Sequence, residues 1–119
     1  MADELAGLIL KGIKTASCGS YDEWLHEGAD PMEKVGGYTV VLNSKDEPVG
    51  IIKYIDMTIM PMNEVTEEIA RAEGEGDLSY EYWYEGHKKF FTELMPQIGK
   101  EFHEEMLLAV ERFELVDVR

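Results

Sequence analysis

A lysine and two hydroxyl residues stand close together near the start of the sequence, at Lys14, Thr15 and Ser17. A partly buried lysine can lose its proton near neutral pH and act as a base. A hydroxyl activated by such a lysine is a known nucleophile arrangement. In a regular strand residues 14 and 17 point to opposite faces, so joint action requires a bend between them. The structural alternative is an exposed Lys14 that helps to end the preceding helix.

The second group of residues that could take part in chemistry is the acidic run Glu73, Glu75 and Asp77, which alternates with Gly74 and Gly76. Like charges raise one another's pKa, and the negative end of a helix dipole disfavours them. This unfavourable placement points to a function, with a solvated charge cluster as the alternative. The run lacks the twelve-residue ligand spacing of a helix-loop-helix calcium site.

Aromatic residues gather at positions 80–84, where an exposed ring could stack on a nucleobase. Trp83 lies at helical spacing with later residues of one face, which predicts a buried stripe made of Trp83, His87, Phe90, Phe91 and Leu94. Tyr82 is then the ring most exposed to solvent.

The metal-ligating residue types do not form a site. His26, His87 and His103 are too scattered for a metal triad, and Cys18 is the single cysteine. His87 is better explained as a hydrogen-bonded core residue. We therefore expect no metal, no cofactor and no internal disulfide, and the reducing cytoplasm suits such a chain.

Composition narrows the possible partners. The 119 residues, 45% apolar and 30% charged, fit one folded domain over residues 1–119. The 11 basic and 25 acidic residues give a net charge of −14, with the region 61–86 especially acidic. Phosphate affinity depends on basic patches, so non-specific binding to DNA or RNA is not expected. No run of 18 apolar residues is present, and no membrane association is predicted.

The elements that would position these residues alternate irregularly between helix and strand. A helix is predicted over residues 3–12, then a brief strand or extended turn at 15–17 and a helix over 21–27 capped by Ser20. The β-branched runs 38–42 and 49–55 predict a hairpin whose second strand continues or bends toward residue 60.

In the second half, Asn63 is expected to cap a helix that reaches about Ala72, and Ser79 to cap a longer helix closed by Pro96. The stretch 106–118 ends in a strand-like run at 113–116. The order lacks the regular repeat of a parallel sheet. We therefore predict an α+β fold with a small, mainly antiparallel sheet or barrel surrounded by helices.

The order and spacing of several short segments resemble the ASCH domain family, which is related to the PUA fold of RNA-modifying proteins. These segments are Asp3-Glu4-Leu5-Ala6, Gly12-Ile13-Lys14-Thr15-Ala16-Ser17, Lys34-Val35-Gly36, Asn63-Glu64-Val65, Glu73-Gly74-Glu75-Gly76-Asp77, the stripe from Trp83 to Phe91, and Glu111-Arg112-Phe113-Glu114. The resemblance covers nearly the whole chain. Many members carry further residues before the first segment, and a threonine is commoner where Ser17 stands.

The resemblance implies a small PUA-like barrel in whose cleft the segment around Lys14 faces the acidic helix end. Members of the family are thought to bind RNA or nucleotides. Some resemble hydrolases that remove an acyl group from the exocyclic amine of a modified cytidine, using a lysine, a hydroxyl residue and a glutamate. The matching residues here are Lys14, Ser17 and Glu73. Further contacts to a nucleoside, nucleotide or RNA would come from Thr15, Glu75, Asp77 and Tyr82.

Two classes of function follow from this resemblance. The first is an amidohydrolase acting on a modified pyrimidine nucleoside, with Ser17 as nucleophile, Lys14 as base and Glu73 in a positioning role. The second is a non-catalytic RNA-binding module. A ribonuclease activity has also been associated with the family, but neither paired histidines nor a convincing carboxylate cluster supports it here.

The charge state of Lys14 stays open at the level of sequence. An ionised Glu73 beside it would hold it as an ammonium, which suits an oxyanion or phosphate partner, whereas burial would favour the neutral base. In either case a lysine drawn into a cleft must be paired. We therefore predict that Nζ of Lys14 lies in a pocket within about 3–4 Å of a Glu73 carboxylate oxygen.

Overall fold

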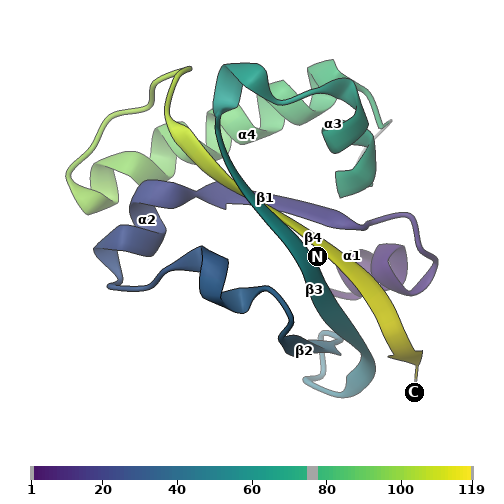
Figure 1. The fold of residues 1–119 in the computed structure, drawn as a ribbon. Coiled ribbons are helices and arrows are strands. Elements are labelled where there is room, and N and C mark those ends of the chain that lie inside the picture. Colours follow the sequence, from purple (N-terminus) through teal and green to yellow (C-terminus); the bar gives the residue numbers. More distant parts are fainter. Residues whose placement is uncertain (1, 75–77, 119) are drawn as a thin grey trace.

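The protein folds around one antiparallel sheet with the strand order β1-β4-β3-β2. The computed structural model describes residues 2–74 and 78–118. The strands are β1 (Ala16–Ser20), β2 (Tyr38–Leu42), β3 (Pro48–Pro61) and β4 (Leu107–Val118). The long strands β3 and β4 cross the whole molecule and curl into an open half-barrel (Figure 1). The predicted α+β class with a mainly antiparallel sheet is confirmed.

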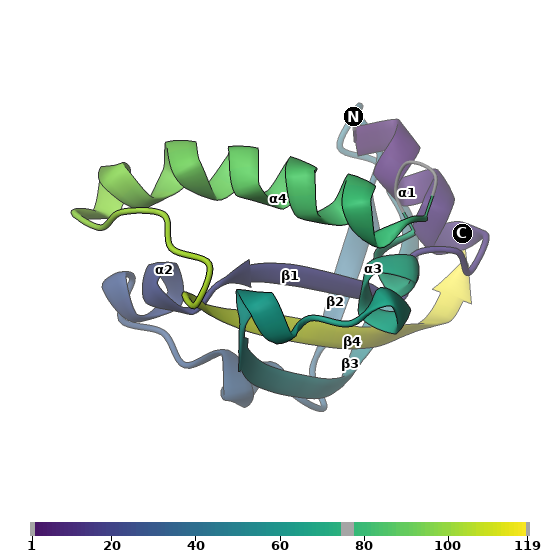
Figure 2. The same ribbon diagram turned by 90° about the horizontal axis from the view of Figure 1, so that it is seen from above.

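Helices surround this sheet, and the two that matter for the site lie over the same face. The helices are α1 (Ala2–Leu10), α2 (Tyr21–His26), α3 (Glu67–Glu73) and α4 (Tyr80–Leu94), with 3-10 turns η1 (Pro31–Lys34), η2 (Met62–Glu64) and η3 (Met95–Ile98). Figure 2 shows α4 lying along β1 with α3 beside its N-terminal end. In the described ranges no helix is both long and apolar enough to cross a bilayer.

The main core fills the space between these helices and the sheet. Trp83 and Phe91 of α4 pack with Leu108 and Val110 of β4, and all four are at most 3% exposed. A second cluster lies where α1 meets the sheet, and consists of Ala6, Val41, Ile52, Tyr54 and Phe113. Burial of these apolar side chains holds α3, α4 and β1 together, and those three elements carry the candidate site.

Two strands are longer than the sequence pattern predicts. The brief strand expected at residues 15–17 runs from Ala16 to Ser20, and the strand-like run expected at 113–116 is part of β4 from Leu107 to Val118. The polar residues of β1 hide its alternating pattern. Pairing with β4 stabilises the extended backbone there, and this long-range contact is invisible in local sequence.

The predicted cap of α3 is wrong. The hydroxyl of Thr66 accepts a hydrogen bond from the N–H of Ile69 at 3.3 Å, so Thr66 and not Asn63 caps this helix. Asn63 lies in the turn η2, and extended backbone at Val65 separates that turn from α3. The N–H of Asn63 donates to the carbonyl of Glu104, which draws the backbone out of the helical path.

Candidate functional site

Backbone hydrogen bonds hold Lys14 between the ends of two helices. The N–H of Lys14 donates to the carbonyl of Leu8 at 3.1 Å, at the end of α1. The N–H of Thr15 donates to the carbonyl of Ala72 at 2.7 Å, at the end of α3. Residues 13–15 are irregular, and β1 begins only at Ala16. This loop provides the bend that joint action of residues 14 and 17 requires.

Gly74 makes this close junction possible. Its φ of +72° is a left-handed conformation that L side chains rarely adopt. A Cβ at this position would lie 2.7 Å from the carbonyl oxygen of Ile13 and 2.9 Å from the nitrogen of Lys14. A glycine therefore both ends α3 and lets the Lys14 backbone approach it.

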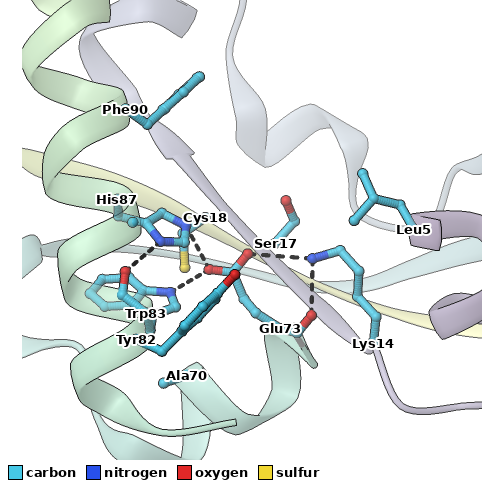
Figure 3. A pocket seen from close by; sticks show the side chains of 11 residues that line it. Leu5, Lys14, Ser17, Cys18, Ala70, Glu73, Tyr82, Trp83, His87 and Phe90 are labelled. Atoms are coloured by element: carbon cyan, nitrogen blue, oxygen red, sulfur yellow. Dashed lines mark hydrogen bonds and ion pairs between the residues drawn. The ribbon is translucent and has the colours of Figure 1, made fainter. Parts of the chain in front are cut away.

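The predicted pair of Lys14 and Glu73 is present and deeply buried. Nζ of Lys14 lies 3.4 Å from Oε1 of Glu73 and donates to the backbone carbonyl of Glu73 at 3.1 Å (Figure 3). Lys14 is 7% exposed and Glu73 is 3% exposed. The carboxylate and the helix-terminal carbonyl both favour a positive charge at this nitrogen.

The other oxygen of Glu73 meets two residues of α4. Oε2 accepts from the indole N–H of Trp83 and lies 2.9 Å from Nε2 of His87. Burial raises the pKa of Glu73, but the hydrogen bond and charge of His87, the charge of Lys14 and the Trp83 donor outweigh it and lower this pKa below its usual value. Glu73 is therefore an ionised carboxylate that joins α3, α4 and the Lys14 loop.

His87 has a larger part in this site than the sequence indicated. It is hydrogen-bonded as expected, since Nδ1 lies 2.8 Å from the carbonyl oxygen of Trp83. Its other ring nitrogen faces Glu73, and its ring stacks on Trp83 at 4.5 Å between centroids. Each ring nitrogen of His87 therefore faces an oxygen atom. The spacing of Trp83 and His87 was visible in the sequence, but only the packing of α3 on α4 brings the Glu73 carboxylate to both of them.

A cavity of about 490 Å³ opens beside this network. Lys14 and Ser17 line it together, and α4 contributes aromatic side chains (Figure 3). Tyr82 and Phe90 line the cavity and are each 54% exposed. The exposure of Tyr82 agrees with the prediction. The prediction that Phe90 is buried is wrong, because Phe91 takes the core position at this turn of α4 and is fully buried.

Two possible nucleophiles border the cavity, and they differ in reactivity. Burial, followed by the charge and hydrogen bonding of Glu73, raises the pKa of the Cys18 thiol well above its usual range. Cys18 is 9% exposed and stays a protonated thiol. Ser17, its neighbour on β1, is less buried and also lines the cavity. Ser17 is therefore the more accessible of these two side chains.

The remaining residues that were predicted to contact a ligand are Thr15, Glu75 and Asp77. Thr15 is not among the described residues that line the cavity, and its hydroxyl lies 3.5 Å from the carbonyl oxygen of Ala72. Glu75 and Asp77 lie outside the described residues. Over the described ranges, no three metal-ligating side chains gather as a metal site.

Fold and site together define a small half-barrel protein with a lysine-glutamate pair at the end of a short helix. A family model described as the ASCH domain matches residues 1–117. The chain belongs to the ASCH domain family, whose structures are PUA-like. Among functionally curated proteins, none matches the sequence significantly.

Solved structures agree with this assignment. The chain is 38% identical to an ASCH domain from Lactobacillus crispatus JV V101, with a TM-score of 0.90, and the match covers 96% of this chain and 71% of that one. A protein from Enterococcus faecalis V583 is 39% identical with a TM-score of 0.85, and this match covers 98% and 69% of the two chains. The chain therefore spans about 70% of these similar proteins.

Proposed function

We propose that the protein binds a modified pyrimidine nucleoside and hydrolyses the acyl amide on its exocyclic nitrogen, as in an N4-acylated cytidine. The observation that carries the proposal is the cavity that Ser17 shares with the Lys14 side chain, with aromatic rings on the facing helix. A hydroxyl nucleophile beside a fixed positive charge suits acyl transfer.

The cavity also suits the proposed substrate in size and surface. Its volume of about 490 Å³ is in the range of small-molecule sites. Tyr82 and Phe90 offer exposed ring faces on which a planar base can stack. The net charge of −14 opposes long polyanions but does not repel a neutral nucleoside.

In the proposed reaction, Oγ of Ser17 attacks the carbonyl carbon of the acyl group. The ammonium of Lys14 stabilises the negative oxygen that develops there, and Glu73 holds Lys14 in place. The bond to the exocyclic nitrogen then breaks, this nitrogen takes up the proton that the Ser17 hydroxyl lost, and cytidine is released. Water hydrolyses the acyl-serine to a carboxylic acid and restores Ser17.

The direct test is to incubate N4-acetylcytidine with the purified protein and follow cytidine by chromatography. We expect turnover by the wild-type protein and its loss in Ser17→Ala. Lys14→Ala should lower kcat by at least about 100-fold, the scale of one oxyanion donor. Lys11→Ala is the matched control, because Lys11 is an exposed lysine of the same N-terminal region. No turnover above the Ser17→Ala variant would contradict the proposal.

A second variant separates the two possible roles of Lys14. Lys14→Arg keeps the positive charge but cannot accept a proton. If Lys14 acts as an ammonium, this variant should retain more activity than Lys14→Ala. Equal inactivity of the two variants, with both folded, would assign the role of base to Lys14. Substrate that binds without turnover would instead indicate a binding module.

A further inference from the structure

A glycine interrupts the row of side chains that α4 presents to the cavity. Gly86 lies in the middle of this helix and lines the cavity together with Tyr82 and Phe90. Apart from proline, glycine is the residue that least favours the interior of a helix. Gly86 therefore weakens α4 relative to a residue with an ordinary side chain.

Close packing does not explain this glycine. A Cβ built on Gly86 would meet no atom of the described residues within 4 Å, and the position is exposed. At Gly74, by contrast, an added Cβ would lie 2.7 Å from a backbone oxygen. The backbone of Gly86 is helical, so it needs no left-handed conformation. The space that a side chain would occupy at position 86 therefore belongs to the cavity.

This empty position lies between two aromatic side chains. Residues four apart on a helix share a face, so Tyr82, Gly86 and Phe90 follow one another along α4. Tyr82 and Phe90 are about 12 Å apart along the helix axis, and both project from α4 toward the same side (Figure 3). Both rings are more than half exposed. The missing side chain thus leaves a slot on α4 that is bordered by two exposed rings.

The slot suits a flat and uncharged ring. Aromatic faces attract other rings by stacking. A flat ring can also approach a glycine backbone more closely than the backbone of any other residue. Leu5 of α1 and the hydroxyl residue Ser17 of β1 line the same cavity. A nucleobase presents ring faces to apolar surfaces of this kind and polar edges to a hydroxyl group.

We propose that Gly86 is the specificity-determining residue of the cavity, and that the pyrimidine ring of the substrate lies in the slot between Tyr82 and Phe90. The inference rests on the proposed function, because it assigns a place to the base of the same nucleoside. It explains why a helix-weakening residue stands at an exposed position where a side chain would fit. A side chain at position 86 would compete with the base and leave the fold intact.

The test measures ligand binding and stability in the same variants. Cytidine, the product of the proposed reaction, is the ligand because it is not consumed, and NMR titration of the backbone amides gives its Kd. We expect Gly86→Leu to weaken cytidine binding by at least about 10-fold. The Tm of this variant should stay the same or rise, because leucine favours a helix more than glycine does. Gly86→Ala should raise the Tm by about 4 °C and weaken binding less, because a methyl group fills less of the slot.

Gly7 offers a matched control in another helix. It lies within α1, where an added Cβ would also meet no described atom within 4 Å, but it is not among the described residues that line the cavity. Gly7→Leu should therefore bind cytidine like the wild type. An equal loss of binding in Gly7→Leu would overturn the inference, as would unchanged binding in Gly86→Leu. A Tm that falls in both Gly86 variants would show that this glycine serves the fold, and would also overturn it.

Turnover separates this inference from the proposed function. Hydrolysis of N4-acetylcytidine with the same KM in wild type and Gly86→Leu would support the proposed function and overturn the role of Gly86. Cytidine binding that depends on Gly86, in a protein that does not hydrolyse N4-acetylcytidine, would support the role of Gly86 and reject the proposed reaction. Failure of the wild-type protein to bind either nucleoside would overturn both.

Discussion

Glu73 joins more functional groups than any other residue described at the site. Its carboxylate meets Lys14, Trp83 and His87 while it is only 3% exposed. A buried charge is tolerated only when it is well paired, and removal of one partner leaves the others without compensation. The same contacts that position Lys14 at the cavity therefore also hold the fold together.

We expect Glu73→Gln to lower the free energy of unfolding by about 3 kcal/mol or more at neutral pH, because it leaves the Lys14 charge buried without its anion. The measurement is urea unfolding followed by circular dichroism. The control is Glu68→Gln, which breaks the exposed 2.7 Å pair between Glu68 and Arg112. The control should cost about 1 kcal/mol or less, and equal losses would contradict the burial argument.

Acidification should weaken the protein through the same carboxyl group. The pKa of Glu73 is lowered from 4.5 in the folded protein, so its stabilising contribution is fully present above that value. The contribution is lost as pH falls through the folded pKa. We therefore expect a smaller acid-induced loss of unfolding free energy in Glu73→Gln than in wild type, measured by urea unfolding across this range. Parallel curves would show that Glu73 is not the coupled group.

Among the elements, the contact between α3 and the Lys14 loop depends on Gly74. Gly74→Ala adds a steric clash with the Ile13 carbonyl to the strain of a positive φ, whereas Gly12 has φ +73° and nothing within 4 Å of an added Cβ. Both variants should cost about 1–2 kcal/mol for the left-handed backbone. Gly74→Ala should cost about 1–3 kcal/mol more. Thermal and urea unfolding of the two variants measure the difference, and equal stability would contradict the close junction.

The start of α3 offers a second test at this scale. Thr66→Ala removes the side-chain acceptor for the N–H of Ile69 and should cost about 1 kcal/mol. Asn63→Ala should stay within about 0.5 kcal/mol of wild type, because its side chain is exposed and does not cap the helix. A larger loss of stability in Asn63→Ala, measured by urea unfolding, would support Asn63 as the cap of α3, as the sequence predicted.

For the whole molecule, the net charge of −14 predicts a stability that depends on salt. Repulsion among like charges opposes the folded state, and salt screens it. We expect the Tm to rise between about 0.02 and about 0.5 M NaCl at neutral pH. Near pH 4.5, the calculated isoelectric point, the same change should have little effect. An unchanged or falling Tm at neutral pH would contradict a dominant role for this repulsion.

Much of the architecture was predictable because its signals are local. The caps Ser20 and Ser79 lie where the sequence placed them, as does the hairpin of β2 and β3. The ends of β1 and β4 were not predictable, because their extended backbones depend on each other through pairing between residues nearly one hundred positions apart. Asn63 failed as a cap for a similar reason, since its backbone bonds to Glu104.

By itself the sequence determined the fold class and the acidic net charge, because both can be judged from composition and from local patterns of helix and strand. The pairing of Lys14 with Glu73 was implied by the resemblance to the ASCH domain family. Only the tertiary structure decided the surroundings of that pair. Packing of α4 on α3 brings His87 to Glu73, and strand register sets Glu111 opposite Ser17. A side chain's charge, exposure and reactivity depend on neighbours that are distant in sequence, and those neighbours exist only once the chain has folded.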